Sequence, residues 1–373
     1  MAQRLWRNGR SGPVRYYSIP GWNRWKVGSM SRSRSLLAVA VLALAAAGGA
    51  SSAAHASSSS WAPLPAHVFA PYFEAYTTDS PAALSRESGA RYLTLAFIQT
   101  PAAGSCTIDW NGNPATPIAS SVYGSDIAKI RAAGGNVIPS FGGYSADHTG
   151  TEIADSCTNV ALIAAAYEKV ITTYNVSRLD LDTEDNSLTN PAGIDRRNKA
   201  IRMVEDWAAT RGRAVQFVYT LPTNVAGLNP TGLSVLQDAV SDHARIDIVN
   251  IMTFDYYDNQ PHEMAADSMT AAQHLYDSLH QLYPARPAHQ LWSMIGVTEM
   301  VGVDDFGPPE IFTTADATTI EHWAVTKHLA ELSFWALERD NGGCPGAGAS
   351  DSCSGVSQST WQFSHTFEPF TRS

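Results

Sequence analysis

The sequence lacks the short motifs that mark several large enzyme classes. It contains no Gly-x-Ser-x-Gly nucleophile turn, no phosphate-binding loop and no glycine fingerprint for dinucleotides. Its eleven histidines include no His-Glu-x-x-His zinc motif. These absences argue against hydrolases with a nucleophile elbow, nucleotide-dependent enzymes and zinc peptidases, and we expect no cofactor and no metal.

Acidic residues are missing from the first 56 residues, which carry eight basic ones. Within this segment, a basic stretch after Met30 precedes a 12-residue apolar run, Leu36–Ala47, and an Ala-x-Ala site ends at Ala56. This order is typical of a secretory signal peptide, and the run is shorter than the roughly 20 residues that span a bilayer. We therefore predict a signal peptide with an upstream extension over 1–56, a short leader over 57–65, and secretion to the extracellular space. A membrane anchor is the alternative.

Basic residues are scarce in the remaining chain. Without the first 56 residues, 17 basic residues face 35 acidic ones, a formal charge of −18 compared with −10 for the whole sequence. Such a surface repels phosphate backbones but is indifferent to a neutral polysaccharide. We expect a monomer that binds neither nucleic acid nor membrane.

Cysteine is also rare, with four residues, and no Cys-x-x-Cys spacing or paired histidine supports zinc as the alternative. An even number in an exported protein predicts two disulfides, and four cysteines allow three pairings. We favour Cys344–Cys353, which closes a short Gly/Ser loop, and Cys106–Cys157, which ties two longer loops together.

Apolar segments typical of strands alternate with alanine-rich helical segments from Val68 onward. Eight strands separated by helices over about 310 residues predict one α/β domain, a single (β/α)8 TIM barrel over 66–373, with a doubly wound open sheet as the alternative. The expected strands are Val68–Tyr72, Tyr92–Ile98, Asn136–Phe141, Leu179–Glu184, Ala214–Thr220, Ile248–Phe254, Leu291–Val297 and Leu332–Leu337. The expected helices include Ala161–Thr173, Asp195–Thr210, Gly232–Val240, Ala266–Leu282 and Thr318–Ala330.

The most informative segment places three acids at alternate positions of one predicted strand. Asp180, Asp182 and Glu184 should share one face, while Leu179 and Leu181 face an apolar layer. Three like charges inside a barrel keep at least one carboxyl protonated near neutral pH, as general acid catalysis requires. Catalytic residues of barrels lie at the C-terminal ends of strands, which favours Glu184 as the proton donor. An exposed edge strand and a divalent-cation site are the alternatives.

This segment resembles the D-x-x-D-x-D-x-E signature of family 18 glycoside hydrolases, the chitinase family, except that Ser177 replaces the outermost Asp. Phe254 likewise stands where many relatives have a tyrosine. Further segments resemble the family in the expected order along the chain, namely Ser140–Gly143, Asn250–Tyr256, Met300–Asp305 and Phe334–Asp340.

The resemblance implies a retaining mechanism in which the substrate's own acetamido group attacks the anomeric carbon. Glu184 would protonate the glycosidic oxygen, Asp182 would orient the acetamido group, and Asp180 would share its proton or charge. Asp255 and Tyr256 would bind the acetamido group, with Tyr257 as the alternative tyrosine.

Two further residues of the matching segments, Met252 and Trp335, are predicted to contact substrate, Trp335 as the floor under a distorted sugar. Its alternative is an ordinary core tryptophan. Trp110 is either an outer sugar platform or loop packing. Of Gln216 and Tyr219 at most one faces the site, because their parity along the strand differs.

The prediction is hydrolysis of β-1,4-linked N-acetylglucosamine polymers, with chitin or its oligomers as the partner. An endo-β-N-acetylglucosaminidase acting on glycoprotein glycans is the nearest enzyme alternative. A catalytically silent chitin-binding barrel is the alternative of another class, and the presence of Glu184 counts against it.

Overall fold

The structure, a computed structural model, describes residues 64–373. All of these residues belong to one compact unit, Ser57–Ser373. The predicted signal segment and all but the last two residues of the predicted leader lie outside the described residues. No helix among residues 64–373 has the length and apolar character needed to cross a bilayer.

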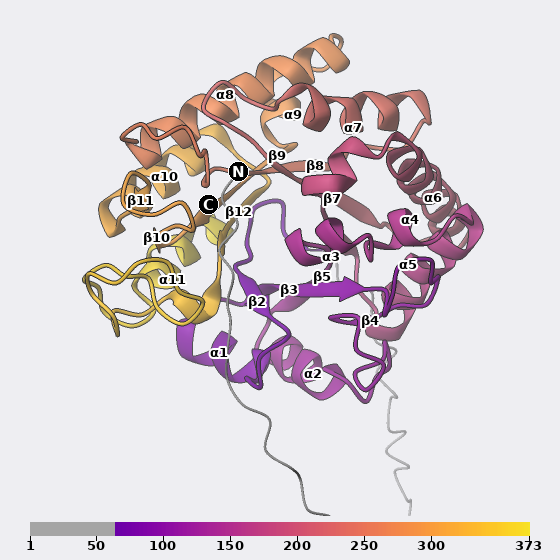
Figure 1. The fold of residues 1–373 in the computed structure, drawn as a ribbon, viewed down its shortest axis with the longest axis horizontal. Helices are drawn as coiled ribbons and strands as arrows, with labels where there is room; N and C mark the ends of the chain where they lie inside the picture. Colours follow the sequence, from indigo (N-terminus) through magenta and orange to yellow (C-terminus); the bar gives the residue numbers. More distant parts are fainter. Residues whose placement is uncertain (1–63) are drawn as a thin grey trace, which may run out of the picture. The chain divides into compact units, whose positions relative to one another are not determined.

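Parallel strands form a ring at the centre of the molecule (Figure 1). Strands β1 and β2 share one position in it, because β1 pairs with the last strand, β12, and β2 pairs with β3. With that position counted once, the ring has eight positions and closes, which confirms the predicted (β/α)8 barrel. In order around the ring the strands are β1 (Val68–Phe69) with β2 (Tyr72–Glu74), β3 (Tyr92–Gln99), β5 (Asn136–Gly142), β6 (Arg178–Asp182), β7 (Gln216–Pro222), β8 (Ile248–Met252), β9 (Ile295–Met300) and β12 (Glu331–Trp335).

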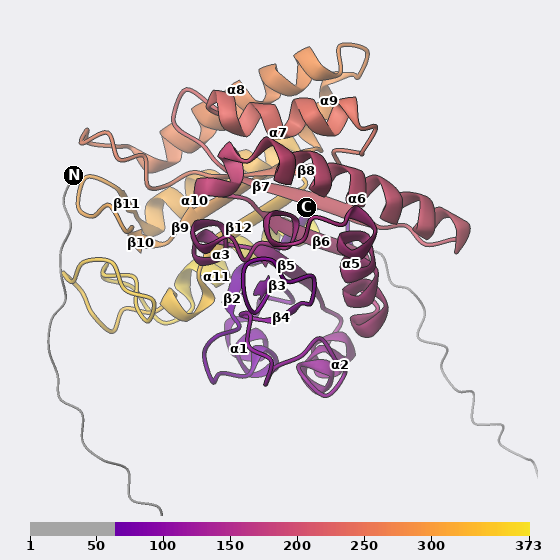
Figure 2. The same cartoon turned by 45° about the vertical axis from the view of Figure 1, so that its right-hand side comes forward.

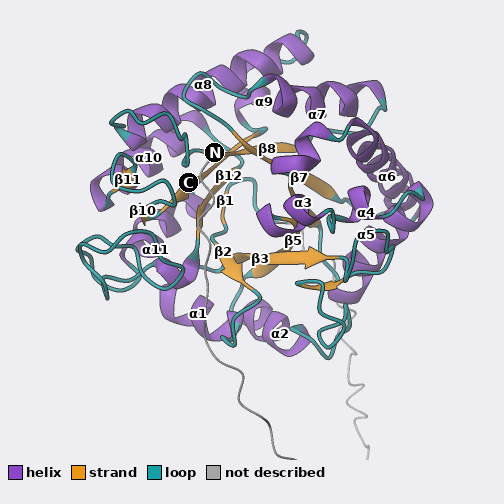
Figure 3. Cartoon of the chain, in the orientation of Figure 1, coloured by secondary structure: helices purple, strands orange, loops and turns teal. Residues whose placement is uncertain are grey.

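Helices cover the outside of the ring in sequence order, as the two views show (Figures 1 and 2). Colouring by secondary structure shows the strands inside and the helices outside (Figure 3). The helices are α1 (Pro81–Ser88), α2 (Gly124–Ala132), α3 (Tyr144–Thr149), α4 (Ile153–Ser156), α5 (Val160–Tyr174), α6 (Pro191–Thr210), α7 (Pro230–Ser241), α8 (Met264–Leu282), α9 (Ala288–Trp292), α10 (Thr314–Lys327) and α11 (Gln362–Phe367). Short 3-10 helices are η1 (Asp185–Thr189), η2 (Leu337–Arg339) and η3 (Glu368–Arg372), and small strands lie outside the ring at β4 (Asp109–Trp110), β10 (Gly302–Val303) and β11 (Ile311–Phe312).

Helix starts are set by capping residues that the periodicity of the sequence does not reveal. Asn190 and Asn229 each accept a backbone N–H and are each followed by proline, so α6 and α7 begin before the predicted positions. Helix α10 ends at Lys327 because His328 adopts a left-handed backbone with φ of 57°. The largest error concerns Leu291, which lies in the short helix α9, since strand β9 begins only at Ile295.

The inside of the barrel is polar, and its side chains are paired with one another. Asn250 Nδ2 donates to Thr298 Oγ1 at 2.7 Å and to Thr220 Oγ1 at 3.1 Å. At the N-terminal end of the barrel, buried Arg178 pairs with Glu331 at 2.9 Å. Because these polar groups satisfy one another, the barrel tolerates a hydrophilic interior.

Both predicted disulfides are present. Cys106 bonds to Cys157 with a Cα–Cα distance of 4.7 Å, and Cys344 bonds to Cys353 with a distance of 6.0 Å. The first joins the segment after β3 to the end of α4, and the second closes the loop after β12.

Candidate active site

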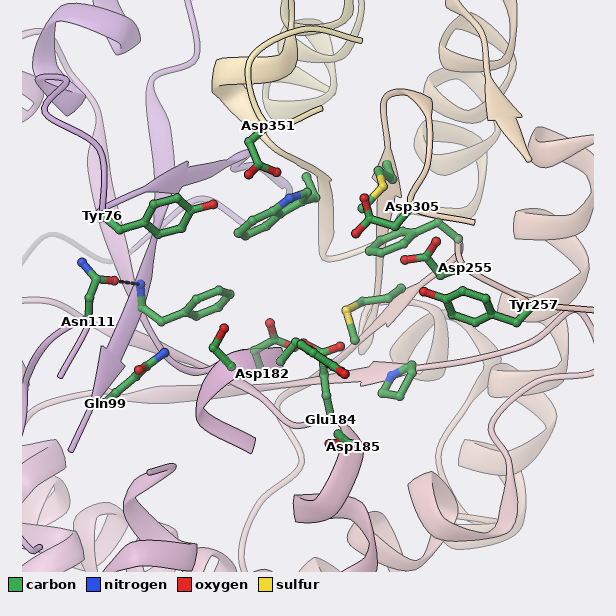
Figure 4. A pocket seen from close by; sticks show the side chains of 18 residues that line it. Tyr76, Gln99, Asn111, Asp182, Glu184, Asp185, Asp255, Tyr257, Asp305 and Asp351 are labelled. Carbon is green, nitrogen blue, oxygen red and sulfur yellow. Dashed lines mark hydrogen bonds between the residues drawn. The ribbon is translucent and has the colours of Figure 1, made fainter. Parts of the chain in front are cut away.

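A cavity of about 740 Å³ opens at the C-terminal ends of the barrel strands. The ends of β3, β6, β7, β8, β9 and β12 all contribute to it (Figure 4). Its lining comprises Tyr76, Phe97, Gln99, Asn111, Tyr144, Ser145, Asp182, Glu184, Asp185, Pro222, Met252, Phe254, Asp255, Tyr257, Met300, Asp305, Trp335 and Asp351. This is the end of the barrel at which active sites form.

The predicted alternation of strand β6 is present. Leu179 and Leu181 pack in the apolar core outside the ring, whereas Asp180 and Asp182 are buried inside it. Glu184 follows the strand with an extended backbone, φ −132° and ψ −177°, so the alternation continues to it. The segment is therefore a buried strand, and the alternative of an exposed edge strand does not hold.

Asp180 is the innermost of the three acids and is held by hydroxyl groups. Its Oδ2 accepts hydrogen bonds from Ser140 Oγ at 2.5 Å and from the Tyr72 hydroxyl at 3.1 Å, and its Oδ1 accepts one from Thr220. Burial raises its pKa to about 6, although the three hydroxyl donors oppose that rise. Asp180 is therefore a buried carboxyl group that three hydroxyl donors hold in place beneath the cavity.

Asp182 is buried as well, with 4% of its surface exposed, yet its Oδ1 has no hydrogen-bond partner among the described residues. Burial raises its pKa well above the ordinary value, and the charges of Glu184, Asp180 and Asp147 raise it further. Burial and these neighbouring charges thus favour the protonated form of Asp182, which lines the cavity and has one oxygen without a partner among the described residues.

Glu184 lies just after the C-terminal end of strand β6 and lines the cavity. Burial is the main cause that raises its pKa to about 7, and the charges of Asp255, Asp185 and Asp305 add to the rise. A carboxyl group with this pKa is protonated in a large fraction of molecules near neutral pH. It can therefore donate a proton to a leaving group and take one back.

Asp147 is a site residue that the sequence reading missed. It is fully buried in α3, and its Oδ2 accepts the backbone N–H of Glu184 in a short hydrogen bond. This contact fixes the backbone at the position from which the Glu184 side chain enters the cavity. The only sequence signal was its place shortly after the Ser140–Gly143 segment, because α3 begins directly after that segment.

The two glycines of that segment allow close packing around the acid strand. A Cβ atom on Gly142, whose φ is +96°, would lie 1.9 Å from the carbonyl oxygen of Asp182. A Cβ atom on Gly143 would lie 2.6 Å from the ring of Phe97. The Gly143 N–H donates to the Asp182 carbonyl at 3.1 Å. Only glycine lets strand β5 end this close to Asp182.

Asp255 and Met252, two of the residues expected to contact substrate, line the cavity. Asp255 Oδ1 accepts the backbone N–H of Phe306 at 3.0 Å. Burial raises the pKa of Asp255 to about 7, with further increases from Asp304 and Asp305, while a hydrogen bond with Tyr257 lowers it. Asp255 is therefore a second carboxyl group able to carry a proton at the cavity wall.

The tyrosine beside Asp255 requires a correction, because Tyr256 does not line the cavity and Tyr257 does (Figure 4). Strand β8 ends at Met252, and both Asp255 and Tyr257 have a left-handed backbone, with φ of 53° and 55°. The alternation of the strand is lost there, and the Tyr256 ring turns inward against His262, 4.8 Å away. Tyr257, the alternative weighed from the sequence, is the tyrosine that faces the cavity.

Trp335 forms one wall of the cavity rather than part of the outer core. Its ring stacks on Phe97 with 5.7 Å between centroids and 8° between planes, and it contacts Tyr72 at 5.8 Å. An apolar surface of this kind fits the face of a sugar ring.

The remaining sequence candidates lie away from the cavity. Gln216 accepts a hydrogen bond from Arg178 at 3.0 Å at the opposite end of the barrel, and Tyr219 donates to Asn198 of helix α6 at 3.0 Å. Ser177 precedes strand β6, so the departure from the family signature falls at the end remote from the cavity. Phe254, the second departure, does line the cavity.

Trp110 packs inside its loop, which is the second of the two roles that the sequence allowed for it. It is fully buried, and its Nε1–H donates to the Tyr174 hydroxyl at 2.8 Å.

The substitution Trp110→Phe should lower the free energy of unfolding by about 1–3 kcal/mol, because it removes a buried hydrogen bond and part of a ring. Urea unfolding would measure this loss, and the KM for a sugar substrate should stay unchanged. An increased KM with unchanged stability would restore the platform reading.

Metal-binding geometry among residues 64–373 occurs at one place, where Asp195, Asp238 and Asp242 lie on helices α6 and α7. The acids of strand β6 do not form such a group. The arrangement of Asp180, Asp182 and Glu184 therefore gives no support to the alternative that this strand binds a divalent cation.

A closed parallel barrel whose acid-bearing strand ends at a sugar-sized cavity defines the class of barrel enzymes that act on glycosidic bonds. The chain belongs to the glycosyl hydrolases family 18, whose sequence profile matches residues 68–281. The family and the fold predicted from the sequence are thereby confirmed, and the comparisons support the enzyme class, a glycoside hydrolase.

Among curated proteins, the chain is 32% identical over 323 residues to a probable bifunctional chitinase/lysozyme of Escherichia coli (strain K12). It is 31% identical over 290 residues to endochitinase 11 of Metarhizium anisopliae. These matches cover 83% and 74% of this chain but only 35% and 53% of the two relatives. The chain thus spans about a third and about half of the lengths of these proteins.

Among solved structures, similarity extends over nearly a whole domain. Catalytic-site mutants of active domain 2 of the thermostable chitinase from Pyrococcus furiosus, complexed with chito-oligosaccharides, are 30% identical to this chain with a TM-score of 0.72. The match covers 83% of this chain and 96% of that one.

Proposed function

We propose that this protein is a secreted chitinase that hydrolyses β-1,4-linked N-acetylglucosamine polymers with retention of configuration. The observation that carries the proposal is the row of three acids at the end of strand β6, with Asp180 buried, Asp182 and Glu184 lining the cavity, and the pKa of Glu184 raised to about 7. The chitinases among the relatives support the substrate class.

In the proposed reaction, the Glu184 carboxyl group donates its proton to the glycosidic oxygen, and the bond from that oxygen to the anomeric carbon breaks. The carbonyl oxygen of the substrate's acetamido group attacks the same carbon from the other face. Asp182 accepts a hydrogen bond from the acetamido N–H through Oδ1, the oxygen that has no partner among residues 64–373. Glu184 then removes a proton from water as the water opens the ring intermediate, which restores the original configuration.

Asp180 supports these steps from below, because its three hydroxyl donors stabilise negative charge while Asp182 carries the shared proton. Trp335 supplies the apolar floor under the reacting sugar. Asp255 and Tyr257 also line the cavity, where they can bind the acetamido group.

The test of the proposal is incubation with chito-oligosaccharides and, separately, with a high-mannose glycopeptide, followed by mass analysis of the products. Chitinase activity yields shorter N-acetylglucosamine oligomers. Release of a mannose-rich glycan would instead identify an endo-β-N-acetylglucosaminidase. Binding of chito-oligosaccharides without any product would identify a silent binding barrel.

Secretion is part of the proposal, supported by the basic and apolar order of residues 30–56 and by the two disulfides, which form in oxidising compartments. N-terminal sequencing of the exported protein should show that cleavage follows Ala56. A mature protein that keeps Leu36–Ala47 would instead support a membrane anchor.

The rate should depend on pH through Glu184. Because its raised pKa keeps the proton on Glu184 up to a pH of about 7 in the free enzyme, kcat/KM should fall about tenfold per pH unit above that value. The substitution Asp305→Asn removes a neighbouring negative charge and should move this alkaline limb to lower pH. The measurement is kcat/KM, taken at substrate concentrations well below KM across the pH range. An alkaline limb at the ordinary pKa of a glutamate would contradict the assignment.

A further inference from the structure

The cavity carries charge of one sign only. Of its eighteen lining residues, six are acidic and none is lysine, arginine or histidine. The proposed reaction uses Asp182, Glu184 and Asp255, and leaves three acids without a role. These three, which we call the rim acids, are Asp185, Asp305 and Asp351.

The rim acids are exposed and come from separate parts of the chain, so they stand around the cavity rather than on one side of it (Figure 4). Asp185 pairs with His148 at 2.7 Å. Asp305 and Asp351 form no ion pair with any residue of 64–373. The charge of Arg339 interacts with both acids, but this side chain is buried and donates to the carbonyl oxygens of Val301 and Val303 at 3.1 and 2.6 Å. Two negative charges at the rim are therefore left for a ligand.

Both free rim acids are held in place by the surrounding structure. Asp351 lies in the loop closed by the Cys344–Cys353 disulfide, and Asn341 Nδ2 donates to the carbonyl oxygen of the next residue at 2.8 Å. Asp305 follows Asp304, whose carboxylate accepts the N–H of Asp255 at 3.1 Å. The rim charges are thus fixed relative to the acids at the centre of the cavity.

A second observation, independent of the rim charges, points to a polar ligand in the cavity. Asp182 is 96% buried at the cavity wall and has an oxygen without a partner in residues 64–373. Three tyrosines that are more than a third exposed, Tyr76 (50%), Tyr144 (60%) and Tyr257 (60%), also line the cavity and offer ring faces to a sugar chain.

We infer that the cavity favours partly deacetylated chitin, in which N-acetylglucosamine alternates irregularly with positively charged glucosamine. An acetylated unit occupies the place above Trp335, where its acetamido group is required, and the ammonium groups of neighbouring units bind Asp305 and Asp351. This inference rests on the proposed function, and it names the form of the polymer. A neutral polymer gains nothing from rim acids, and a polymer with carboxylate substituents is repelled by them.

The experiment compares kcat/KM for soluble chitosan, with about half of its units acetylated, against fully acetylated chito-oligosaccharides. At low salt and mildly acidic pH, the ratio of the two values should fall about twofold to fivefold for Asp305→Asn and for Asp351→Asn, and roughly tenfold for the double variant. The matched control is Asp277→Asn, which removes an exposed charge of helix α8 outside the cavity and should leave the ratio unchanged. Because each ratio is taken on one enzyme at one pH, a shifted pKa of Glu184 cancels.

Salt provides a second measurement on the unaltered protein, because added salt should lower kcat/KM for chitosan and leave that for the neutral oligomers unchanged. The inference would be overturned if the ratio of kcat/KM for chitosan to that for neutral oligomers did not change with salt, or if it fell as much in the Asp277→Asn control as in the rim variants. Binding of both polymers to Glu184→Gln protein is measured alongside. Absence of turnover on neutral oligomers would contradict the proposed function alone, and tighter binding of chitosan that weakens in the rim variants would still support the charge preference.

Discussion

Replacement of Glu184 by glutamine should lower kcat for chito-oligosaccharides by about a thousandfold, within the range that a general acid contributes. Glutamine has the shape of the protonated carboxyl group but holds its protons too tightly to transfer one. The backbone N–H bond to Asp147 does not involve the side chain, so the geometry of the strand end should persist. Binding of the oligosaccharide, measured by calorimetry, should stay within a few-fold of the unaltered protein.

The control for this substitution is Glu87→Gln, which makes the same chemical change at the exposed end of helix α1 and should leave kcat unchanged. If Glu184→Gln kept most of its activity, another group would be the proton donor. Loss of folding, seen by circular dichroism, would mean that Glu184 stabilises the barrel rather than the transition state.

Replacement of Asp182 by asparagine should lower kcat by about a hundredfold or more without lowering stability. Burial and the charges of Glu184, Asp180 and Asp147 raise the pKa of Asp182 and so oppose its ionised form in the folded protein, and asparagine removes that cost. What asparagine cannot supply is the negative charge that stabilises the positively charged ring intermediate as it forms. Activity and the free energy of unfolding should therefore separate in this variant.

Asp180→Asn offers the matched comparison on the same strand. Asp180 accepts three hydroxyl donors, and an amide cannot accept all three, so this variant should lose about 1–3 kcal/mol of stability. Urea unfolding of both variants measures the contrast. Equal destabilisation by the two substitutions would show that the fold holds Asp182 as firmly as Asp180. That result would contradict the expectation drawn from the unpartnered oxygen of Asp182.

Strand β6 shows what the alternation of apolar and acidic residues in a sequence can predict. The spacing of Leu179, Leu181 and the three acids was sufficient to predict which side chains face the barrel interior, because neighbouring residues on a strand must point to opposite faces. The same rule failed after strand β8, where the positive φ of Asp255 and Tyr257 breaks the alternation and exchanges the roles of Tyr256 and Tyr257. Nothing in the residue types marks that break.

Residues that act through long-range contacts were beyond the sequence reading. Asp147 is an unremarkable acid in a short helix until the fold brings it against the N–H of Glu184. Asp351 is likewise one polar residue in a Gly/Ser loop until the Cys344–Cys353 bond and the end of β12 set that loop beside the cavity.

The sequence by itself was sufficient to predict the barrel and the strand that carries the acids, because periodicity and alternate spacing are local properties of the chain. It favoured one of three possible disulfide pairings, and the structure has that pairing. Tertiary structure alone decided which tyrosine faces the cavity, that Trp110 belongs to the core, and that charges from three distant segments share one rim. Those outcomes depend on how separate segments meet in space, and the physical reason is that burial and electrostatic fields arise only from side chains that folding has brought together.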